Sequence, residues 1–306
     1  MSDHSAVIEV RALTKRYGAS RGVEDLTFEV TTGEAFGFLG PNGAGKTTTI
    51  RTLLDFIRPT SGLVRVFGTD PRSEGMQVHR RIGYLPGELA LYERMTGEQF
   101  VRTFAQLRGA GRNGASMWPR ASELAERLSL DLSRRIHELS HGNKQKLGLV
   151  QAFMHAPDLL VLDEPTQGLD PLVQQTFYAL VEQERAGGAT VFLSSHVMPE
   201  VERVCDRVGI IREGRLAVLA DVGELKAKAR RRIEFHFDRP VSAIAFAPLP
   251  GVTDATAHGD SVSLTVEGPV DAVIKEAARH DVVSVETHEP SLEDAFLAFY
   301  GPDGTR

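Results

Sequence analysis

Short apolar runs alternate with longer amphipathic segments along residues 1–225. This alternation is typical of a mostly parallel sheet covered by helices, so we predict an α/β body. The runs at 159–162 and 191–193 are apolar without any alternation, as expected for central strands that are buried on both faces. The predicted strands are residues 7–10, 26–30, 35–39, 63–67, 82–85, 159–162, 190–194 and 208–212.

The segment between Pro86 and Leu159 lacks a strong strand pattern. Its apolar residues follow helical spacing in three stretches, residues 96–107, 116–128 and 144–155. We therefore predict a helical subdomain, about residues 88–158, inserted into the α/β body.

The pattern changes near residues 223–232, and we place a domain boundary there, with a small C-terminal α+β domain at 226–306. The predicted order β-α-β-β-α-β resembles a ferredoxin-like unit with one extra helix. The basic residues at this boundary form either a solvated linker or a contact with lipid headgroups. The predicted elements are strand 232–238, a short helix near 240–246, strands 252–257 and 261–266, helix 269–279, strand 282–287 and helix 291–299.

Composition narrows the function classes. The chain has 306 residues, enough for about two domains, and its net charge of −6 argues against a nucleic-acid partner. Cys205 is the only cysteine, which excludes an internal disulfide and fits a reducing cytoplasm. The N-terminus lacks a signal-peptide pattern, and no stretch approaches the roughly 18 apolar residues of a membrane-spanning helix. Any role in transport would therefore require a separate membrane-spanning chain.

A glycine-rich loop carries the clearest chemistry. Residues 40–47 read GPNGAGKT and lie between a predicted strand and a helical pattern, which is the context in which G-x-x-x-x-G-K-[ST] holds a polyphosphate. Backbone N–H groups and the helix dipole favour the anion. Lys46 is expected to reach the β and γ phosphates, and Thr47 to ligate Mg²⁺. The expected nucleotide-binding residues here are Gly40, Asn42, Gly43, Gly45, Lys46, Thr47 and Thr48.

Two carboxylates follow the apolar run 159–162. Asp163 at the end of a buried strand could hold Mg²⁺ through water, and Glu164 could polarise an attacking water. Taken alone, the pair is equally compatible with a strand that leads into an acidic loop.

With these motifs the sequence resembles the ATP-binding-cassette family over residues 5–220, which implies a P-loop NTPase fold, an ATP and Mg²⁺ requirement and a nucleotide-binding domain at 1–225. Residues 139–143, LSHGN, match the family's signature loop, and residues 168–170, GLD, match its D-loop. His196 corresponds to the family's switch histidine. Tyr17 lies where the family stacks an aromatic ring on adenine, although it could also be a partly buried core or edge residue.

The resemblance also implies an assembly. In the family, the signature loop of one protomer caps the γ-phosphate held by another, so Ser140, Gly142 and Asp170 are expected to face nucleotide across a homodimer. Ser140 precedes a predicted helix and could serve both as its cap and as a phosphate ligand. Separate transmembrane permease subunits and a place at the cytoplasmic face of the plasma membrane are further expectations.

Two departures from the family affect turnover. His141 and Asn143 replace the glycine and glutamine of the usual LSGGQ signature. Gly87 stands where the family has a glutamine that senses Mg²⁺ and the attacking water. Glu88 could substitute for that glutamine or be a surface carboxylate.

Three functions are compatible with these features. The first is an ATP-hydrolysing transporter subunit that energises export. The second is a soluble ATPase acting on DNA, ribosomes or cofactor assembly, whose members often have two cassettes, a coiled coil or a basic face. The third is a low-turnover regulator, suggested by Gly87. Residues 290–297, PSLEDAFL, resemble the tail of the bacterial drug-resistance and antibiotic-export branch, but they carry no information on the exported compound.

Overall fold

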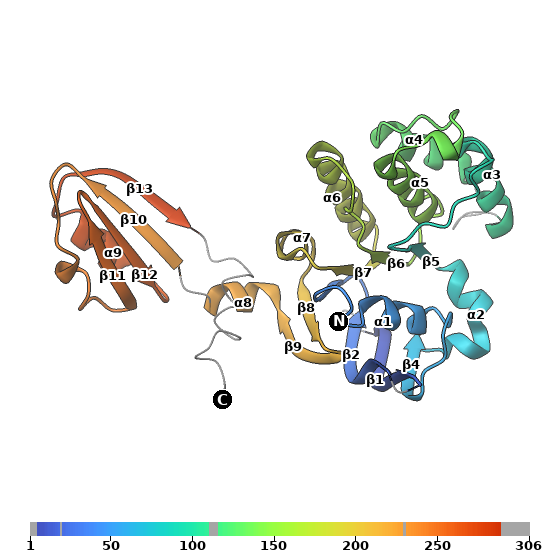
Figure 1. Ribbon diagram of the computed structural model, residues 1–306, viewed down its shortest axis with the longest axis horizontal. Coiled ribbons are helices and arrows are strands. Elements are labelled where there is room, and N and C mark those ends of the chain that lie inside the picture. The colour runs from blue at the N-terminus through green and yellow to red at the C-terminus, as the bar shows by residue number, and fades with distance from the viewer. Residues whose placement is uncertain (1–4, 19, 110–115, 229–230, 289–306) are drawn as a thin grey trace. The chain divides into compact units, whose positions relative to one another are not determined.

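The computed structural model describes residues 5–18, 20–109, 116–228 and 231–288. These residues form two compact units, 1–220 and 221–306, which we call the first and second units (Figure 1). Among the described residues, none of the helices is both long and apolar enough to cross a bilayer.

A six-stranded sheet forms the centre of the first unit. Its strand order is β5-β6-β7-β3-β8-β9, and the pairs β5–β6, β6–β7, β3–β7 and β3–β8 are parallel. Every residue of β3, β6 and β7 is buried, which confirms the prediction of central strands. The strands are β3 (Ala35–Leu39), β5 (Ile82–Leu85), β6 (Leu159–Asp163), β7 (Thr190–Ser195), β8 (Arg207–Arg212) and β9 (Arg215–Asp221).

Three of the predicted strands lie in a second, antiparallel sheet of order β2-β1-β4, so the expectation of one mostly parallel sheet is only partly correct. The strands are β1 (Ala6–Tyr17), β2 (Ser20–Thr31) and β4 (Ser61–Val66). Along β4 buried and exposed residues alternate near its end, and antiparallel sheets tolerate such burial on one face. The two sheets share a core in which the rings of Phe28, Phe36 and Phe192 stack at centroid distances of 5.5 to 6.1 Å.

Three helices occupy the described part of the segment between β5 and β6. Helices α3 (Gly97–Arg108), α4 (Trp118–Arg127) and α5 (His141–Phe153) lie together on one side of the first unit, with a 3₁₀ turn η1 (Ile136–Glu138) before α5 (Figure 1). Helix α5 begins three residues before the predicted start because Ser140 caps it. The other helices of this unit are α1 (Lys46–Leu53), α2 (Pro71–Arg80), α6 (Pro171–Ala186) and α7 (Met198–Val204).

The second unit packs helical turns on one face of a four-stranded antiparallel sheet of order β11-β12-β10-β13. Its core contains the stacked rings of Phe235, Phe237 and Phe246. The helix predicted near 240–246 is only a 3₁₀ turn, and the helix predicted at 291–299 lies outside the described residues. The elements are α8 (Val222–Lys228), β10 (Arg231–Phe237), η2 (Ala243–Ala245), β11 (Val252–His258), β12 (Ser261–Val266), α9 (Asp271–Ala277) and β13 (Val282–His288).

Candidate functional site

The glycine-rich loop joins β3 to α1 in a conformation that its glycines permit. Gly43 and Gly45 have φ angles of +79° and +115°, in the left-handed region that favours glycine. A Cβ on Gly40 would lie 2.4 Å from the carbonyl oxygen of Ile211, so no side chain fits there. The backbone is thus free to approach a ligand closely.

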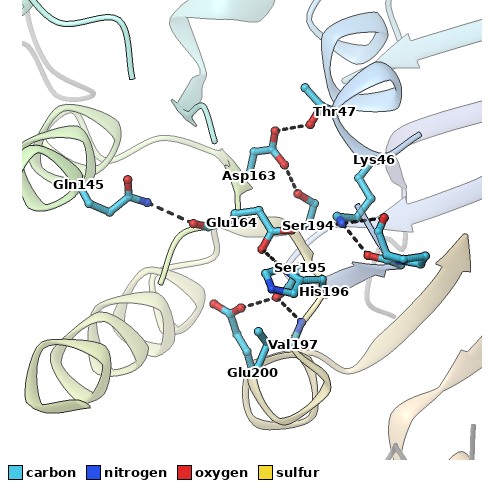
Figure 2. Close-up of polar contacts among 12 residues, drawn as sticks. Lys46, Thr47, Gln145, Asp163, Glu164, Ser194, Ser195, His196, Val197 and Glu200 are labelled. Atoms are coloured by element: carbon cyan, nitrogen blue, oxygen red, sulfur yellow. Dashed lines mark hydrogen bonds and ion pairs between the residues drawn. The ribbon is translucent and has the colours of Figure 1, made fainter. Parts of the chain in front are cut away.

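Lys46 folds back over this loop (Figure 2). Its Nζ donates hydrogen bonds to the carbonyl oxygens of Gly40 at 2.6 Å and Pro41 at 3.3 Å. The same nitrogen lies 3.2 Å from Glu164 Oε1. Because Lys46 is only 6% exposed, its positive charge is directed into the site rather than into solvent.

Thr47 and Asp163 bring together side-chain oxygens that could ligate a metal ion. Thr47 Oγ1 donates to Asp163 Oδ2 at 2.9 Å, and the hydroxyl of Ser194 donates to the other oxygen of Asp163. Within the described part of the chain, no cluster of three or more histidine, cysteine or acidic residues could hold a metal by itself. A hydroxyl and one carboxylate fit Mg²⁺, which usually keeps several waters and takes further oxygens from a phosphate.

Glu164 and His196 meet because they follow neighbouring parallel strands. Asp163 of β6 pairs with Ser194 of β7, so the residues after both strand ends emerge at the same edge of the sheet. His196 Nδ1 lies 2.8 Å from Glu164 Oε2 (Figure 2). The Glu164 carboxylate is therefore held between Lys46 and His196, on a backbone with a φ angle of +51°.

These groups surround a pocket of about 470 Å³. The exposed fraction of Tyr17 is 47%, so this residue is no core tyrosine, and a Cβ on Gly22 would lie 3.0 Å from its ring. The predicted residues that line the pocket are Tyr17, Asn42, Gly43, Gly45, Lys46, Thr47, Thr48, Asp163, Glu164 and His196.

The sequence motifs did not predict three further polar residues that line this pocket, namely Arg51, Tyr84 and Gln167. Burial, and secondarily the charge of Asp163, raises the pKa of Tyr84 to about 12, so its hydroxyl stays protonated. Arg51 lies one turn after Thr47 on α1, a spacing that could have indicated it.

Gly87 also lines the pocket, next to Glu88. A Cβ on Gly87 would lie 3.4 Å from Cγ and Oδ2 of Asp163, which is ordinary van der Waals contact. The site therefore has room for a side chain at position 87 that the chain does not supply.

Four predicted residues do not line the pocket: Gly40, Ser140, Gly142 and Asp170. The Ser140 hydroxyl accepts from the Asn143 N–H at 3.3 Å and caps α5. Asp170 caps α6 by accepting from the backbone N–H groups that follow it. A Cβ on Gly142 would lie 2.5 Å from the carbonyl oxygen of Gly168, so the first turn of α5 packs closely against the loop before α6.

Comparisons with known proteins identify the family of this chain. A model of the ABC transporter family matches residues 23–167. The bacitracin transport ATP-binding protein BcrA of Bacillus licheniformis is 34% identical, with 97% of this chain and 98% of that protein covered. The daunorubicin/doxorubicin resistance ATP-binding protein DrrA of Streptomyces peucetius is 33% identical over 96% of this chain and 92% of its own length.

Solved structures give the same result for the first unit. The structure of an ATP-binding subunit of an ABC transporter is 32% identical, with a TM-score of 0.67, and covers 72% of this chain and 92% of its own. The dimeric structure of the bacterial ABC transporter cassette MJ0796 is 20% identical, with a TM-score of 0.62, and covers 70% of this chain and 98% of its own, which supports the fold alone.

Proposed function

The chain belongs to the ABC transporter family as an ATP-binding subunit, and on this basis we propose that it hydrolyses ATP to export drug-like, antibiotic or lipid-like compounds through separate membrane subunits. The observation that carries the proposal is the single pocket in which the glycine-rich loop, Asp163, Glu164 and His196 converge. The relatives named for bacitracin transport and daunorubicin resistance support the class of exported compound.

ATP binding rests on charge and on stacking. Lys46 would exchange its carbonyl partners and Glu164 for the β and γ phosphates, since it is the lysine buried beside the loop. Asn42, Gly43, Gly45 and Thr48 surround the phosphates, and Tyr17 offers its exposed ring to the adenine base. Thr47 and Asp163 would hold Mg²⁺, which neutralises developing charge on the phosphates.

Hydrolysis would use Glu164 as the general base. Binding of the phosphates takes Lys46 away from Glu164 and leaves its Oε1 free to accept a proton from the attacking water. His196 keeps the other oxygen in place through its contact at 2.8 Å and can also approach the γ-phosphate. These roles make Glu164 and His196 the catalytic pair.

Ser140, Gly142 and Asp170 would serve a second copy of the chain. Because they do not line the pocket of their own chain, they can reach nucleotide only in a partner's pocket. The N–H groups at the start of α5, with the helix dipole, suit a phosphate. We therefore propose a head-to-tail homodimer with two nucleotides at its interface.

A groove of about 320 Å³ offers a docking surface for the membrane partner at the cytoplasmic face of the plasma membrane. Phe100 and Phe104 of α3 line it, so the groove lies on the helical insertion. Tyr84 and Pro86 line both this groove and the nucleotide pocket, so a segment bound in the groove would touch the wall of the pocket. Arg108 donates to the Ile82 carbonyl oxygen at 3.1 Å and ties α3 to β5 there.

The second unit would be a ferredoxin-like accessory domain, about residues 226–306. Its strand order, with η2 in place of the first helix and α9 as the second, supports this topology. All residues assigned to nucleotide lie before it. A chain that ends at residue 225 should therefore fold and bind Mg-ATP. The domain at 226–306 would then support the dimer or regulate it.

Turnover with and without the membrane partner tests the transport function. The ATPase rate of the chain alone is compared with its rate after co-purification with its permease subunits and reconstitution into lipid vesicles. We expect a slow basal rate that rises with the partner. Hydrolysis that the permease leaves unchanged would contradict the coupling, and no hydrolysis in either state would contradict the enzymatic assignment.

A further inference from the structure

A second glutamate, Glu200 of α7, lies behind the catalytic histidine. Ser195 Oγ donates a hydrogen bond to Glu200 Oε2 at 2.6 Å. The same hydroxyl oxygen accepts the N–H of Val197 at 3.0 Å (Figure 2). These contacts therefore fix the backbone on both sides of His196, because Ser195 and Val197 are the residues immediately before and after it.

Glu200 is buried in a position that destabilises a charged carboxylate. It is only 2% exposed, and among the described residues no lysine or arginine forms an ion pair with it. By contrast, the buried carboxylate of Glu34 is paired with Arg207 at 2.9 Å. A buried carboxylate without a cationic partner destabilises the fold, so we looked for a functional role of Glu200.

The strand that carries Ser195 also sets the position of the catalytic pair. Ser195 ends β7 and is fully buried, so the strand and the hydroxyl contact fix where the chain leaves the sheet. The next residue, His196, is 45% exposed in its side chain, and its Nδ1 contacts Glu164 Oε2. The position of the ring therefore depends on this contact and on the backbone that carries it.

We propose that Glu200 is a positioning residue for ATP hydrolysis. Its carboxylate orients the Ser195 hydroxyl, and this hydroxyl fixes the backbone that aims His196 at Glu164. The inference rests on the proposed function, because it assigns Glu200 a role in that same hydrolytic step. It gives Glu200 no contact with nucleotide or water.

Protonation provides a signature of this role. Burial is the main cause that raises the pKa of Glu200 to about 7, opposed by the hydroxyls of Ser195 and Thr166. The neighbouring Glu164 raises this pKa further and His196 lowers it, while Tyr178 and Cys205 are the other titratable groups that interact with Glu200. Above this pKa the carboxylate can only accept the Ser195 O–H; below it, Glu200 gains a proton of its own and the hydroxyl is no longer forced into one direction.

Kinetics of the full chain test the proposal with two variants, Glu200→Gln and Ser195→Ala. For each we expect kcat to fall about tenfold while KM for ATP changes less than about twofold, because the base is misplaced and the phosphate contacts are untouched. Between about pH 6 and pH 9, the rise in kcat near the pKa of Glu200 should disappear in Glu200→Gln. The double variant should be no slower than the slower single variant, since both changes cut one chain of contacts.

Glu34→Gln is the matched control. Glu34 is also buried, at 8% exposed, and accepts the hydroxyl of Thr31 at 2.8 Å. It precedes β3, whereas the glycine-rich loop follows that strand. We expect this variant to lose thermal stability but to keep the wild-type kcat and pH profile.

A measurement without nucleotide separates positioning from folding. In protein labelled with ¹⁵N-histidine and ¹⁵N-valine, the His196 ring and the Val197 amide should shift in Ser195→Ala and in Glu200→Gln, and stay unchanged in Glu34→Gln. If both variants keep kcat, the pH profile and these signals, the proposal is wrong. If Glu200→Gln does not fold, the same criteria applied to Ser195→Ala decide.

The failure of the proposed function would look different. Wild-type protein that hydrolyses no ATP, with or without the permease, contradicts the enzymatic assignment itself. A wild type that hydrolyses ATP and loses this activity in Glu164→Gln supports that assignment whatever Glu200 does. The Glu200 and Ser195 results then bear on the positioning role alone.

Discussion

The pocket beside the glycine-rich loop and the surface at the start of α5 use polar side chains in opposite ways. In the pocket, Lys46, Glu164 and His196 hold one another through side-chain contacts across β6, β7 and the loop. At the second surface, Ser140 and Asp170 turn back to the backbone of their own helices as caps. The pocket is thus a network of contacts between side chains that are distant along the chain. The surface at the start of α5 instead has local contacts between side chains and the backbone next to them.

We infer from this difference that the pocket is already assembled in a single chain, whereas the α5 surface acts only with a second copy. The pocket depends on long-range contacts that only the folded sheet supplies, so its variants should act on the binding and chemistry of a single chain. The α5 surface depends on local caps, so its variants should act on what a second copy brings. The following experiments test this division.

The largest effect is expected for Glu164→Gln. It keeps the shape of the side chain but removes the proposed base, so kcat should fall by about 10² to 10⁴ while ATP affinity is kept. Size-exclusion chromatography with ATP should show an accumulated dimer. Glu182→Gln, at an exposed position of α6, is the control. A Glu164→Gln protein that stays monomeric under conditions where the wild type dimerises would contradict the dimer model.

Lys46→Ala should weaken ATP binding by about 10- to 100-fold, because it deletes the charge that we propose faces the β and γ phosphates. Titration calorimetry with Mg-ATP measures this loss. Lys144→Ala removes a lysine of α5 that lies 3.7 Å from Glu93, outside the pocket, and should bind normally. Unchanged affinity in Lys46→Ala would contradict the assigned phosphate site.

Ser140→Ala should reduce turnover about tenfold while a single chain binds ATP as before, if the hydroxyl serves the partner's nucleotide as proposed. It also removes the α5 cap, which stabilises by about 1 kcal/mol. Thr96→Ala removes the cap of α3 in the same way and controls for that loss. Equal turnover in the two variants would mean that Ser140 is only a cap.

The effect expected at Gly87 is smaller. The pocket has room for a side chain there, and Gly87→Gln should raise basal turnover about two- to fivefold by holding the attacking water. Glu88→Ala should lower turnover only if Glu88 takes the place of the missing glutamine. Rapid hydrolysis by the wild type alone, unaltered by either change, would make Gly87 a neutral replacement.

Periodicity in the sequence predicted most of the strands because their apolar runs are long and buried, as in β6 and β7. It did not predict α2 or β9. Helix α2 has only two buried residues, Pro71 and Val78, and so leaves almost no apolar stripe. Strand β9 alternates between exposed and half-buried residues, so its pattern is weak. The division of strands between two sheets depends on pairings that no local pattern contains.

The site followed a similar rule. Motif residues with fixed spacing, such as Lys46, Thr47 and Asp163, were predicted because their chemistry requires neighbours along the chain. Tyr84 and Gln167 were missed because only the folded chain brings them to the pocket. Glu200 also gave no signal, since a glutamate on a short helix is ordinary until its burial is known.

The left-handed backbone of Glu164, with its φ angle of +51°, has a consequence for folding stability. A residue with a Cβ is strained in this conformation by about 1 to 2 kcal/mol, whereas glycine is not. In urea denaturation, the free energy of unfolding of Glu164→Gly should therefore exceed that of Glu164→Gln by about 1 kcal/mol, although both variants lack the carboxylate. Equal resistance would mean that the turn relaxes in solution. The carboxylate that the chemistry needs thus occupies a conformation that folding alone would assign to glycine.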